Sequence, residues 1–476
     1  MRRASFLLTT AGLLAFIAVL VFVSARGQQT TPVSLVVSGG TVVTVDGERR
    51  VIHDGAVAVS GDRIVAVGSS DEIRSKYSAA ETIDARGQIV LPGLVNTHGH
   101  APMVLFRGLA DDMALMDWLT KYIFPAEAKT VSPEFVRVGT RLAALEMIES
   151  GTTTFADMYY FEDDIAEATR EAGLRAVLGQ SVIKFPVADA KTPEEGLARA
   201  EAFIKKWLQD PLITPAVAPH APYTLEPHSL KAARALADKY NVPALIHLAE
   251  TKDEVKTIQD AHRMSPTRYL ASLGFWKGRS LAAHAVFLDD KDLDTLVAAK
   301  TGLAHNPGSN MKLASGIAAV EKWIAKGARG GLGTDGAASS NDLDMFQAMR
   351  LAALLHKVGT GDPRVMSAPQ VLDMATRGGA AALGLEDRIG SLEPGKQADL
   401  ILVATDGARQ TPMFDPISHL VYVAHGDDVT TTIVAGRTLM RQRQVRSLNA
   451  GDVLRDARAM AERVKRAVAP APKEND

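Results

Sequence analysis

Two histidines separated by a single glycine, His98 and His100, follow the apolar segment 91–97. If that segment is a strand, residues two apart point to the same face, and both imidazoles can converge on one ion. Imidazole is the commonest metal ligand among protein side chains. A lone His-x-His pair is equally compatible with two surface or hydrogen-bonded histidines, so it needs partners elsewhere in the chain.

Such partners stand at or just after the ends of other short apolar segments, and they are His247, Glu250, His284 and Asp335. Taken singly, each has an ordinary structural interpretation. A histidine can cap a strand, a glutamate can be a solvated loop acid, and an aspartate among glycines can belong to a turn. Together with the histidine pair they place several imidazole and carboxylate groups at predicted strand ends. Independent structural roles would rarely produce that pattern, so it indicates a functional site.

The donor types limit which metal the site can hold. The chain has no cysteine, so only imidazole, carboxylate or other oxygen donors are available. Three imidazoles and one carboxylate suit zinc, with iron as the alternative, and leave a position for water. The expected ligands are His98, His100, His247 and Asp335. The fourth apolar segment and the residues that follow it, 213–223, contain no lysine that could be carbamylated to bridge a second metal. One divalent metal is therefore expected.

The elements that position these residues follow from the apolar pattern between residues 91 and 385. Eight short apolar segments alternate there with amphipathic helical patterns, and they are 94–98, 153–158, 175–180, 213–219, 244–250, 280–285, 302–307 and 331–336. Strands that alternate with helices pair in parallel through right-handed crossovers. Eight of them predict an α/β fold of the (β/α)8 barrel type, whose active face lies at the carboxyl ends of the strands.

Strand-like sequence flanks the barrel on both sides. Residues 33–90 alternate apolar and polar side chains, with turn signals at Asp46-Gly47 and Gly61-Asp62, and they predict an all-strand layer. The pattern returns in residues 386–446, where the strands have no partners nearby in the sequence. We therefore expect one discontinuous small β-sandwich domain built from the N- and C-terminal segments. Residues 447–476 predict a C-terminal helix and tail.

Composition and the first residues bear on partners and location. The 476 residues include 53 basic and 55 acidic side chains, which gives no basic face for nucleic acid and favours a small-molecule substrate. Residues 1–27 join a basic start to an apolar run and small residues, as in a signal peptide or an uncleaved anchor. The sequence thus predicts an exported protein, periplasmic or extracellular, with a membrane tether as the alternative. Barrels of this type often form homo-oligomers, and that question stays open.

Longer motifs around these residues resemble the amidohydrolase superfamily, in particular its S-adenosylhomocysteine/methylthioadenosine deaminase branch. That branch is related to triazine hydrolases and guanine deaminases. The resemblance covers the chain from about Val33 to Val445. The motifs that carry it are LPGLVNTHGHAPM, RGLADDMALMDWL, DMYYF, PHAPYT, IHLAET, AHAVFLDD, HNPGSNMKL and GTDGAASSNDLDMF.

The resemblance implies a mononuclear metal-dependent hydrolytic deaminase of an aminated heteroaromatic ring, above all an adenosine-type nucleoside. In such a reaction the metal lowers the pKa of a water molecule to near neutral. By resemblance, Asp335 binds the metal and accepts the proton of the water, and His284 orients the nucleophile. Glu250 gives a proton to the ring nitrogen and shuttles another to the departing ammonia, which makes it a general acid–base catalyst.

The resemblance also implies substrate contacts. Trp118 would stack near the nucleoside, Glu127 would accept hydrogen bonds from the ribose hydroxyls, and His220 would be the substrate-binding histidine of the fourth strand. A carboxylate suits a vicinal diol because it accepts two hydrogen bonds. The alternatives are that Trp118 packs under its loop and that Glu127 is an acid at a helix start.

Departures from the branch pattern bear on the substrate. Gln180, which is also expected to contact the substrate, stands where nucleoside deaminases of the branch tend to carry an arginine after the third strand, and AHCVH is replaced by AHAVF, with Ala285 and Phe287 changed. The first change removes a fixed positive charge with five donors. Both cast doubt on S-adenosylhomocysteine, whose amino-acid tail needs charged partners. Two other functions stay open: hydrolysis of another C–N or C–Cl bond, and an exported binding protein on a barrel scaffold.

Overall fold

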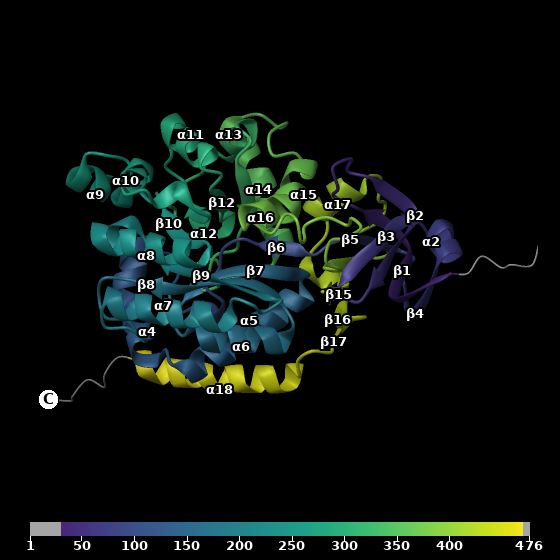
Figure 1. The fold of residues 1–476 in the computed structure, drawn as a ribbon, viewed down its shortest axis with the longest axis horizontal. Helices are drawn as coiled ribbons and strands as arrows, with labels where there is room; N and C mark the ends of the chain where they lie inside the picture. The colour runs from purple at the N-terminus through teal and green to yellow at the C-terminus, as the bar shows by residue number, and fades with distance from the viewer. Residues whose placement is uncertain (1–29, 470–476) are drawn as a thin grey trace, which may run out of the picture.

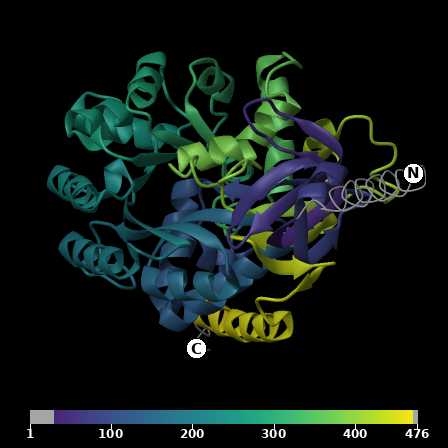
Figure 2. The ribbon, with the colours of Figure 1, turned by 45° about the vertical axis from the view of Figure 1, so that its right-hand side comes forward.

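The computed structural model describes residues 30–469, so the predicted signal or anchor segment 1–27 lies outside the described residues. Eight parallel strands in the order β13-β12-β11-β10-β9-β8-β7-β6 form a barrel (Figures 1 and 2). They are β6 (Leu94–Asn96), β7 (Thr152–Tyr159), β8 (Arg175–Val182), β9 (Ile213–Pro219), β10 (Ala244–Leu248), β11 (Ser280–His284), β12 (Gly302–His305) and β13 (Arg329–Leu332). Backbone hydrogen bonds from Thr97 N–H to the Leu332 carbonyl (2.8 Å) and from Asp335 N–H to the His98 carbonyl (3.0 Å) join the first strand to the last.

Helices surround the barrel and return the chain to the start of each next strand. They are α5 (Pro133–Glu149), α6 (Glu162–Ala172), α7 (Pro193–Trp207), α8 (Pro227–Tyr240), α9 (Lys252–His262), α10 (Pro266–Ser272), α11 (Asp290–Ala298), α12 (Pro307–Lys312), α13 (Val320–Ala325), α14 (Met345–Thr360), α15 (Ala368–Ala375) and α16 (Arg377–Ala382). Several begin at a serine or threonine followed by proline. At α5 and α7 the Ser132 and Thr192 side chains accept hydrogen bonds from the helix backbone, which satisfies amides that the helix leaves free.

A second sheet of nine strands is built from the chain segments before and after the barrel. Its order is β17-β16-β15-β14-β5-β1-β2-β3, and β4 pairs with β1. The strands are β1 (Thr31–Val43), β2 (Val51–Ser60), β3 (Arg63–Ser69), β4 (Tyr77–Asp84), β5 (Gln88–Pro92), β14 (Leu400–Ala404), β15 (Val429–Val434), β16 (Arg437–Arg441) and β17 (Gln444–Val445). The purple N-terminal and yellow C-terminal strands lie together in Figure 2. The prediction of a barrel joined to a small β domain from both chain segments is confirmed.

Two details differ from the sequence prediction. Residues 33–90 are not all strand, because helix α2 (Ser70–Lys76) interrupts them; Ser69 and Glu72 form a reciprocal cap that starts it. The eighth barrel strand ends at Leu332, before the predicted segment does. Asp335 then adopts a left-handed backbone conformation with φ 63°, so its side chain belongs to a turn above the barrel.

The remaining elements cover the barrel mouth and its side. They are η1 (Ala101–Phe106), α3 (Leu115–Asp117), η2 (Trp118–Ile123), α4 (Phe124–Thr130), η3 (Pro222–Thr224), η4 (Phe275–Lys277), α17 (Pro416–Tyr422), η5 (Gly426–Asp428) and α18 (Ala450–Val468). The amphipathic helix α18 packs against α4 and α5, and in Figure 1 it runs along the lower edge of the barrel. Within residues 30–469, no helix combines the length and the apolar character that crossing a bilayer requires.

A buried ion pair ties the barrel to the second sheet. Arg175, the first residue of β8, donates from Nε and Nη2 to the two Asp399 oxygens at 2.8 and 3.1 Å, and both side chains are almost fully buried. Asp399 also accepts a hydrogen bond from the Ala435 amide at 2.7 Å. Two parallel hydrogen bonds of this kind fix geometry as well as charge.

We predict that Arg175→Ala lowers the free energy of unfolding by about 3–5 kcal/mol, because the Asp399 charge would stay buried without its partner. Urea denaturation measures the change. Arg74→Ala is the matched control, since the Arg74–Asp71 pair is exposed and such pairs contribute about 0–1 kcal/mol. Equal losses of unfolding free energy in the two variants would show that the buried pair does not stabilise the contact between the barrel and the second sheet.

Candidate metal and substrate site

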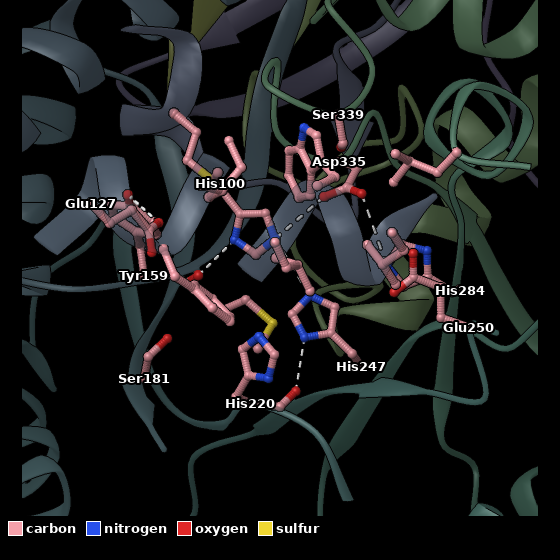
Figure 3. A pocket seen from close by; sticks show the side chains of 18 of the residues that line it. His100, Glu127, Tyr159, Ser181, His220, His247, Glu250, His284, Asp335 and Ser339 are labelled. Carbon is pink, nitrogen blue, oxygen red and sulfur yellow. Dashed lines mark hydrogen bonds and ion pairs between the residues drawn. The ribbon is translucent and has the colours of Figure 1, made fainter. Parts of the chain in front are cut away.

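The predicted ligands converge at the carboxyl ends of the barrel strands. Nε2 of His100 and Nε2 of His98 lie 3.3 and 3.5 Å from Asp335 Oδ1. Nε2 of His247 lies 3.4 Å from Nε2 of His100. Figure 3 shows His100, His247 and Asp335 facing one another. Residues that are far apart in the sequence thus form two overlapping groups of potential metal ligands, one of His98, His100 and Asp335 and one of His98, His247 and His284.

Neighbouring groups fix which ring nitrogen faces that point. Nδ1 of His100 donates a hydrogen bond to the Met158 carbonyl at 2.7 Å, and Nδ1 of His247 donates to the His220 carbonyl at 2.8 Å. The Nε2 atoms therefore carry free lone pairs, which is the usual arrangement of metal-binding histidines. Nε2 of His98 is buried and has no hydrogen-bond partner. An orphaned nitrogen beside a carboxylate is what a metal site requires, so these residues fit a metal.

Charge states in the cluster agree with metal binding, with one exception. Burial lowers the pKa of His98 to about 4. Burial would raise the pKa of Asp335, but the neighbouring His100 and His98 imidazoles hold it well below its ordinary value. Burial would also lower the pKa of His100, yet the Asp335 and Asp157 carboxylates raise it to about 9. A divalent cation takes the place of that proton, because a metal ligand must be neutral imidazole.

Backbone strain is concentrated around the cluster. His284 and Ala285 follow each other in the left-handed region at φ 70° and 48°, and Ala249 and Asp335 adopt it at φ 49° and 63°. For residues other than glycine, such conformations cost about 1–3 kcal/mol each and are found mainly at functional sites. Hydrogen bonds from the Ala285 amide to the Leu248 carbonyl (2.9 Å) and from the Asp335 amide to the His98 carbonyl (3.0 Å) hold them in place.

Glu250 and His284 lie beside the ligand cluster. His284 Nε2 is 3.7 Å from Glu250 Oε2 and 4.0 Å from Asp335 Oδ2. The Glu254 carboxylate accepts the amide hydrogens of Ala249 and Glu250, both at 2.8 Å, and so holds the loop that carries Glu250. Burial raises the pKa of Glu250. A buried carboxyl group with a raised pKa next to a nucleophile site is suited to giving and taking a proton during a reaction.

A pocket of about 670 Å³, open at its mouth, adjoins the cluster. The predicted substrate residues Trp118, Glu127 and His220 all line it, together with His100, Glu250, His284 and Asp335. Trp118 and Glu127 are buried. Glu127 belongs to the first turn of α4 and also faces the pocket. The position therefore allows both interpretations that the sequence left open, a helix-start acid and a substrate contact.

Gln180 is not on the pocket lining. Its side-chain amide donates to Asp189 Oδ2 at 2.9 Å, and its oxygen accepts the Glu162 amide hydrogen at 3.4 Å. The next residue, Ser181, lines the pocket instead. Adjacent strand residues point to opposite faces, so an assignment shifted by one position selects the wrong side chain. The substrate contact predicted for Gln180 does not fit this geometry.

Other lining residues were missed by the sequence reasoning, and they include Tyr159, Tyr160, Ser181, Tyr223 and Ser339. The Tyr159 hydroxyl donates a hydrogen bond to Glu127 Oε1 at 2.7 Å. Tyr159 and Tyr160 belong to the motif DMYYF, which was recognised as a motif without a role for its tyrosines. Ala285, one of the two positions changed in AHAVF, is buried in the core and does not line the pocket.

Sequence comparisons agree with this site. The amidohydrolase family matches residues 89–439, and an imidazolonepropionase-like composite domain of bacteria matches residues 55–77. The chain is 46% identical to a 5-methylthioadenosine/S-adenosylhomocysteine deaminase of Syntrophus aciditrophicus over 91% of this chain and 98% of the relative. It is 43% identical to a 5′-deoxyadenosine deaminase of Methanococcoides burtonii over 90% of this chain and 97% of the relative.

Solved structures give the same result. A zinc-bound adenosine deaminase from Xanthomonas campestris is 38% identical, with a TM-score of 0.90 over 92% of this chain and all of that one. A zinc-bound atrazine chlorohydrolase from Arthrobacter aurescens is 26% identical, with a TM-score of 0.84 over 90% of this chain and all of that one.

The prediction of an exported protein is contradicted by these comparisons. The relatives that match along almost their whole length are named methylthioadenosine/S-adenosylhomocysteine deaminases, and nothing among them points to export. The prediction depended on a basic start followed by an apolar run, which lies outside the described residues. Such a pattern is compositional and is weak evidence when no homologue supports it.

Barrel, ligand cluster and relatives thus lead to one assignment. The protein is a hydrolase with a metal-binding group of histidines and an aspartate, and its substrate is a small molecule. The family accounts for most of the chain, including every residue of the ligand cluster. The chain belongs to the amidohydrolase family.

Proposed function

We propose that the protein is a mononuclear zinc-dependent deaminase that hydrolyses the amino group of an adenosine-type nucleoside and releases ammonia. One observation carries the proposal: a single pocket joins the ligand cluster and Glu250 to Trp118 and Glu127. The ligand cluster and Glu250 can perform hydrolysis at a ring carbon. Trp118 and Glu127 can hold a base and a ribose. The names of the relatives and the zinc in the related structures support this combination.

The proposed ligands are those that the sequence predicted, His98, His100, His247 and Asp335. When bound there, the ion lowers the pKa of a water molecule to near 7 and so supplies a nucleophile at neutral pH. The same donors also suit iron, and metal analysis of purified protein distinguishes the two. His220, at the end of the fourth strand, stands where a bridging lysine would be needed for a second ion, which supports one metal.

The surrounding side chains then move the protons. Asp335, ionised through its contacts with His98 and His100, takes a proton from the attacking water. His284, 4.0 Å from Asp335 Oδ2, orients the nucleophile. Glu250 gives a proton to the ring nitrogen next to the amine-bearing carbon, and a second proton then passes to the leaving amino group. Overall, water and the ring amine become a ring carbonyl and ammonia, so atoms and protons balance.

Ammonia release from a substrate panel tests the proposal. The panel contains adenosine, 5′-deoxyadenosine, methylthioadenosine, S-adenosylhomocysteine, guanine, cytosine derivatives and aminotriazines. We expect release from the adenosine compounds and little from the others. Release from guanine or aminotriazines alone would overturn the nucleoside assignment and favour hydrolysis of another C–N bond.

A pH dependence follows from Glu127. Burial raises the pKa of Glu127 to about 7, although the Tyr159 hydroxyl donates a hydrogen bond that lowers it. The ionised carboxylate accepts two ribose hydroxyls, whereas the protonated group loses part of that capacity. We predict that kcat/KM for adenosine rises about tenfold between one pH unit below and one above this pKa.

Two controls test whether the rise of kcat/KM with pH comes from Glu127. A 2′,3′-dideoxyadenosine substrate has no diol and should lack the rise at the same enzyme concentration. Tyr159→Phe removes a hydrogen bond that favours ionisation, so the rise should move to higher pH. If adenosine and its dideoxy analogue showed the same pH profile, Glu127 would not bind the ribose.

A further inference from the structure

Among the described residues, the pocket lining is acidic apart from its histidines. Three carboxylate side chains line the pocket, Glu127, Glu250 and Asp335, and its lining contains neither lysine nor arginine. Burial keeps the field of a fixed charge strong, because little water screens it. A substrate group that enters beside Glu127 thus meets negative charge and no fixed guanidinium or ammonium group.

The wall around Glu127 is otherwise apolar or aromatic. Leu119, Ile123, Phe124 and Tyr160 line the pocket on this side. Phe124 stands one helical turn before Glu127 in α4, so both side chains share a face of that helix. Its ring contacts the Phe185 ring edge-to-face at 5.4 Å. In Figure 3, Glu127 and Ser181 lie on one side of the pocket, and Glu250 and His284 lie on the other.

The carboxyl end of β8, behind this wall, places no lysine or arginine on the pocket lining of the described residues either. Gln180 holds the Asp189 carboxylate through its amide, at 2.9 Å. Asp189 also accepts the Phe161 amide hydrogen at 2.8 Å and is buried. The region beyond Ser181 therefore contains another acidic side chain where a negatively charged ligand would need a cation.

The closest alternative for a charged tail is a second, open cavity. It shares Leu115 and Leu313 with the pocket and is lined by Lys252 and Asp253. These residues follow Glu250 in the chain, so this cavity adjoins the side of the pocket where the ring is hydrolysed. With the base at Glu250 and the ribose at Glu127, the 5′ substituent would lie on the side of the pocket opposite Glu250, near Glu127 and its apolar neighbours.

We propose that the site selects nucleosides whose 5′ substituent is uncharged, such as methylthioadenosine or 5′-deoxyadenosine, and discriminates against S-adenosylhomocysteine. The inference rests on the proposed deaminase function and on the ribose position at Glu127. The tail of S-adenosylhomocysteine is a zwitterion: its ammonium group can pair with an acidic side chain, but its carboxylate finds no lysine or arginine in the pocket lining. A carboxylate near Glu127 without a counter-charge costs several kcal/mol. A methylthio group instead gains free energy by contact with apolar side chains.

The test compares kcat/KM of the zinc-loaded protein for methylthioadenosine, 5′-butylthioadenosine and S-adenosylhomocysteine. The butyl compound matches the length of the charged tail without its charges. We expect it to react within about tenfold of methylthioadenosine, and S-adenosylhomocysteine to react at least about 100-fold more slowly. A smaller preference, or a butyl compound as slow as S-adenosylhomocysteine, would overturn the inference and leave the deaminase intact. No ammonia from any adenosine compound would overturn the deaminase itself.

A pair of substitutions tests the charge directly. Phe124→Arg places a cation on the half-buried wall beside Glu127, and Phe124→Leu changes the size of the side chain without adding charge. We expect the ratio of kcat/KM for S-adenosylhomocysteine to that for methylthioadenosine to rise about tenfold or more in the arginine variant only. Because the ratio is taken within one variant, a general loss of activity does not obscure it. An equal rise in the leucine variant would show that space decides selectivity and would overturn the inference.

Discussion

Glu250→Gln is expected to lower kcat for ammonia release by about 100- to 10,000-fold, the usual contribution of a general acid–base group. The amide keeps the shape of the side chain but cannot donate a carboxyl proton to the ring nitrogen. Glu250 lies 3.7 Å from His284 and is not among the proposed ligands, so the metal content should not change. Initial rates and elemental analysis of the same preparation measure both quantities.

Glu194→Gln serves as the control for this substitution, because Glu194 is mostly exposed on α7 and should leave kcat unchanged. A Glu250→Gln protein that turns over at the parental rate would remove Glu250 from the mechanism. Loss of metal from the Glu250→Gln protein would show that Glu250 binds the metal and would remove its assignment to proton transfer. Either result would require another acid–base group in the pocket.

His98→Ala is expected to weaken metal binding by more than 100-fold, because changing even outer-shell partners of a metal commonly costs about 10- to 100-fold in affinity. His98 is buried and its free Nε2 faces Asp335 at 3.5 Å, so the substitution removes one donor from both groups of potential ligands. Activity at limiting zinc should fall in proportion. Excess zinc should restore part of the activity and raise the melting temperature, because a ligand that binds only the native state stabilises it.

Zinc titration of the metal-stripped protein, followed by activity and thermal melting, measures this effect. The matched control is His228→Ala, since His228 is largely exposed on α8 and should bind no essential metal. If His98→Ala bound zinc as tightly as the parent, His98 would not be a ligand. The cluster would then depend on His100, His247 and Asp335 alone.

The barrel could be predicted from the sequence because its strands are continuous apolar segments with helices between them. Each segment is largely buried on both faces, so a continuous apolar run identifies it without an alternation of apolar and polar residues. Helix α2 was missed because it lies within a region of strand-like alternation, although the Ser69–Glu72 cap was visible in the sequence. The early end of β13 was missed because Gly331 and Gly333 are compatible with strand and turn alike.

The ligand cluster could be predicted for a related reason. Parallel strands all end on one face of a barrel, so polar residues at those ends must meet. The substrate wall is different, because helices and loops carry it and their direction depends on packing across the fold. Gln180 illustrates the limit: its motif position could be recognised, but only the structure shows that Ser181 faces the pocket.

Pairing of β5 with β14 has a consequence for folding during synthesis on the ribosome. Leu400 pairs with Pro92 and Leu402 with Val90, so the partner of β5 is made about 300 residues later. At about 5–20 residues per second, that interval lasts roughly 15–60 s. During it, the edge formed by Ile89, Val90 and Leu91, which is fully buried in the finished protein, stays open to pairing with any other chain. Slow synthesis lengthens this exposure, so nascent chains made slowly and without a chaperone should yield more aggregates that start at this strand.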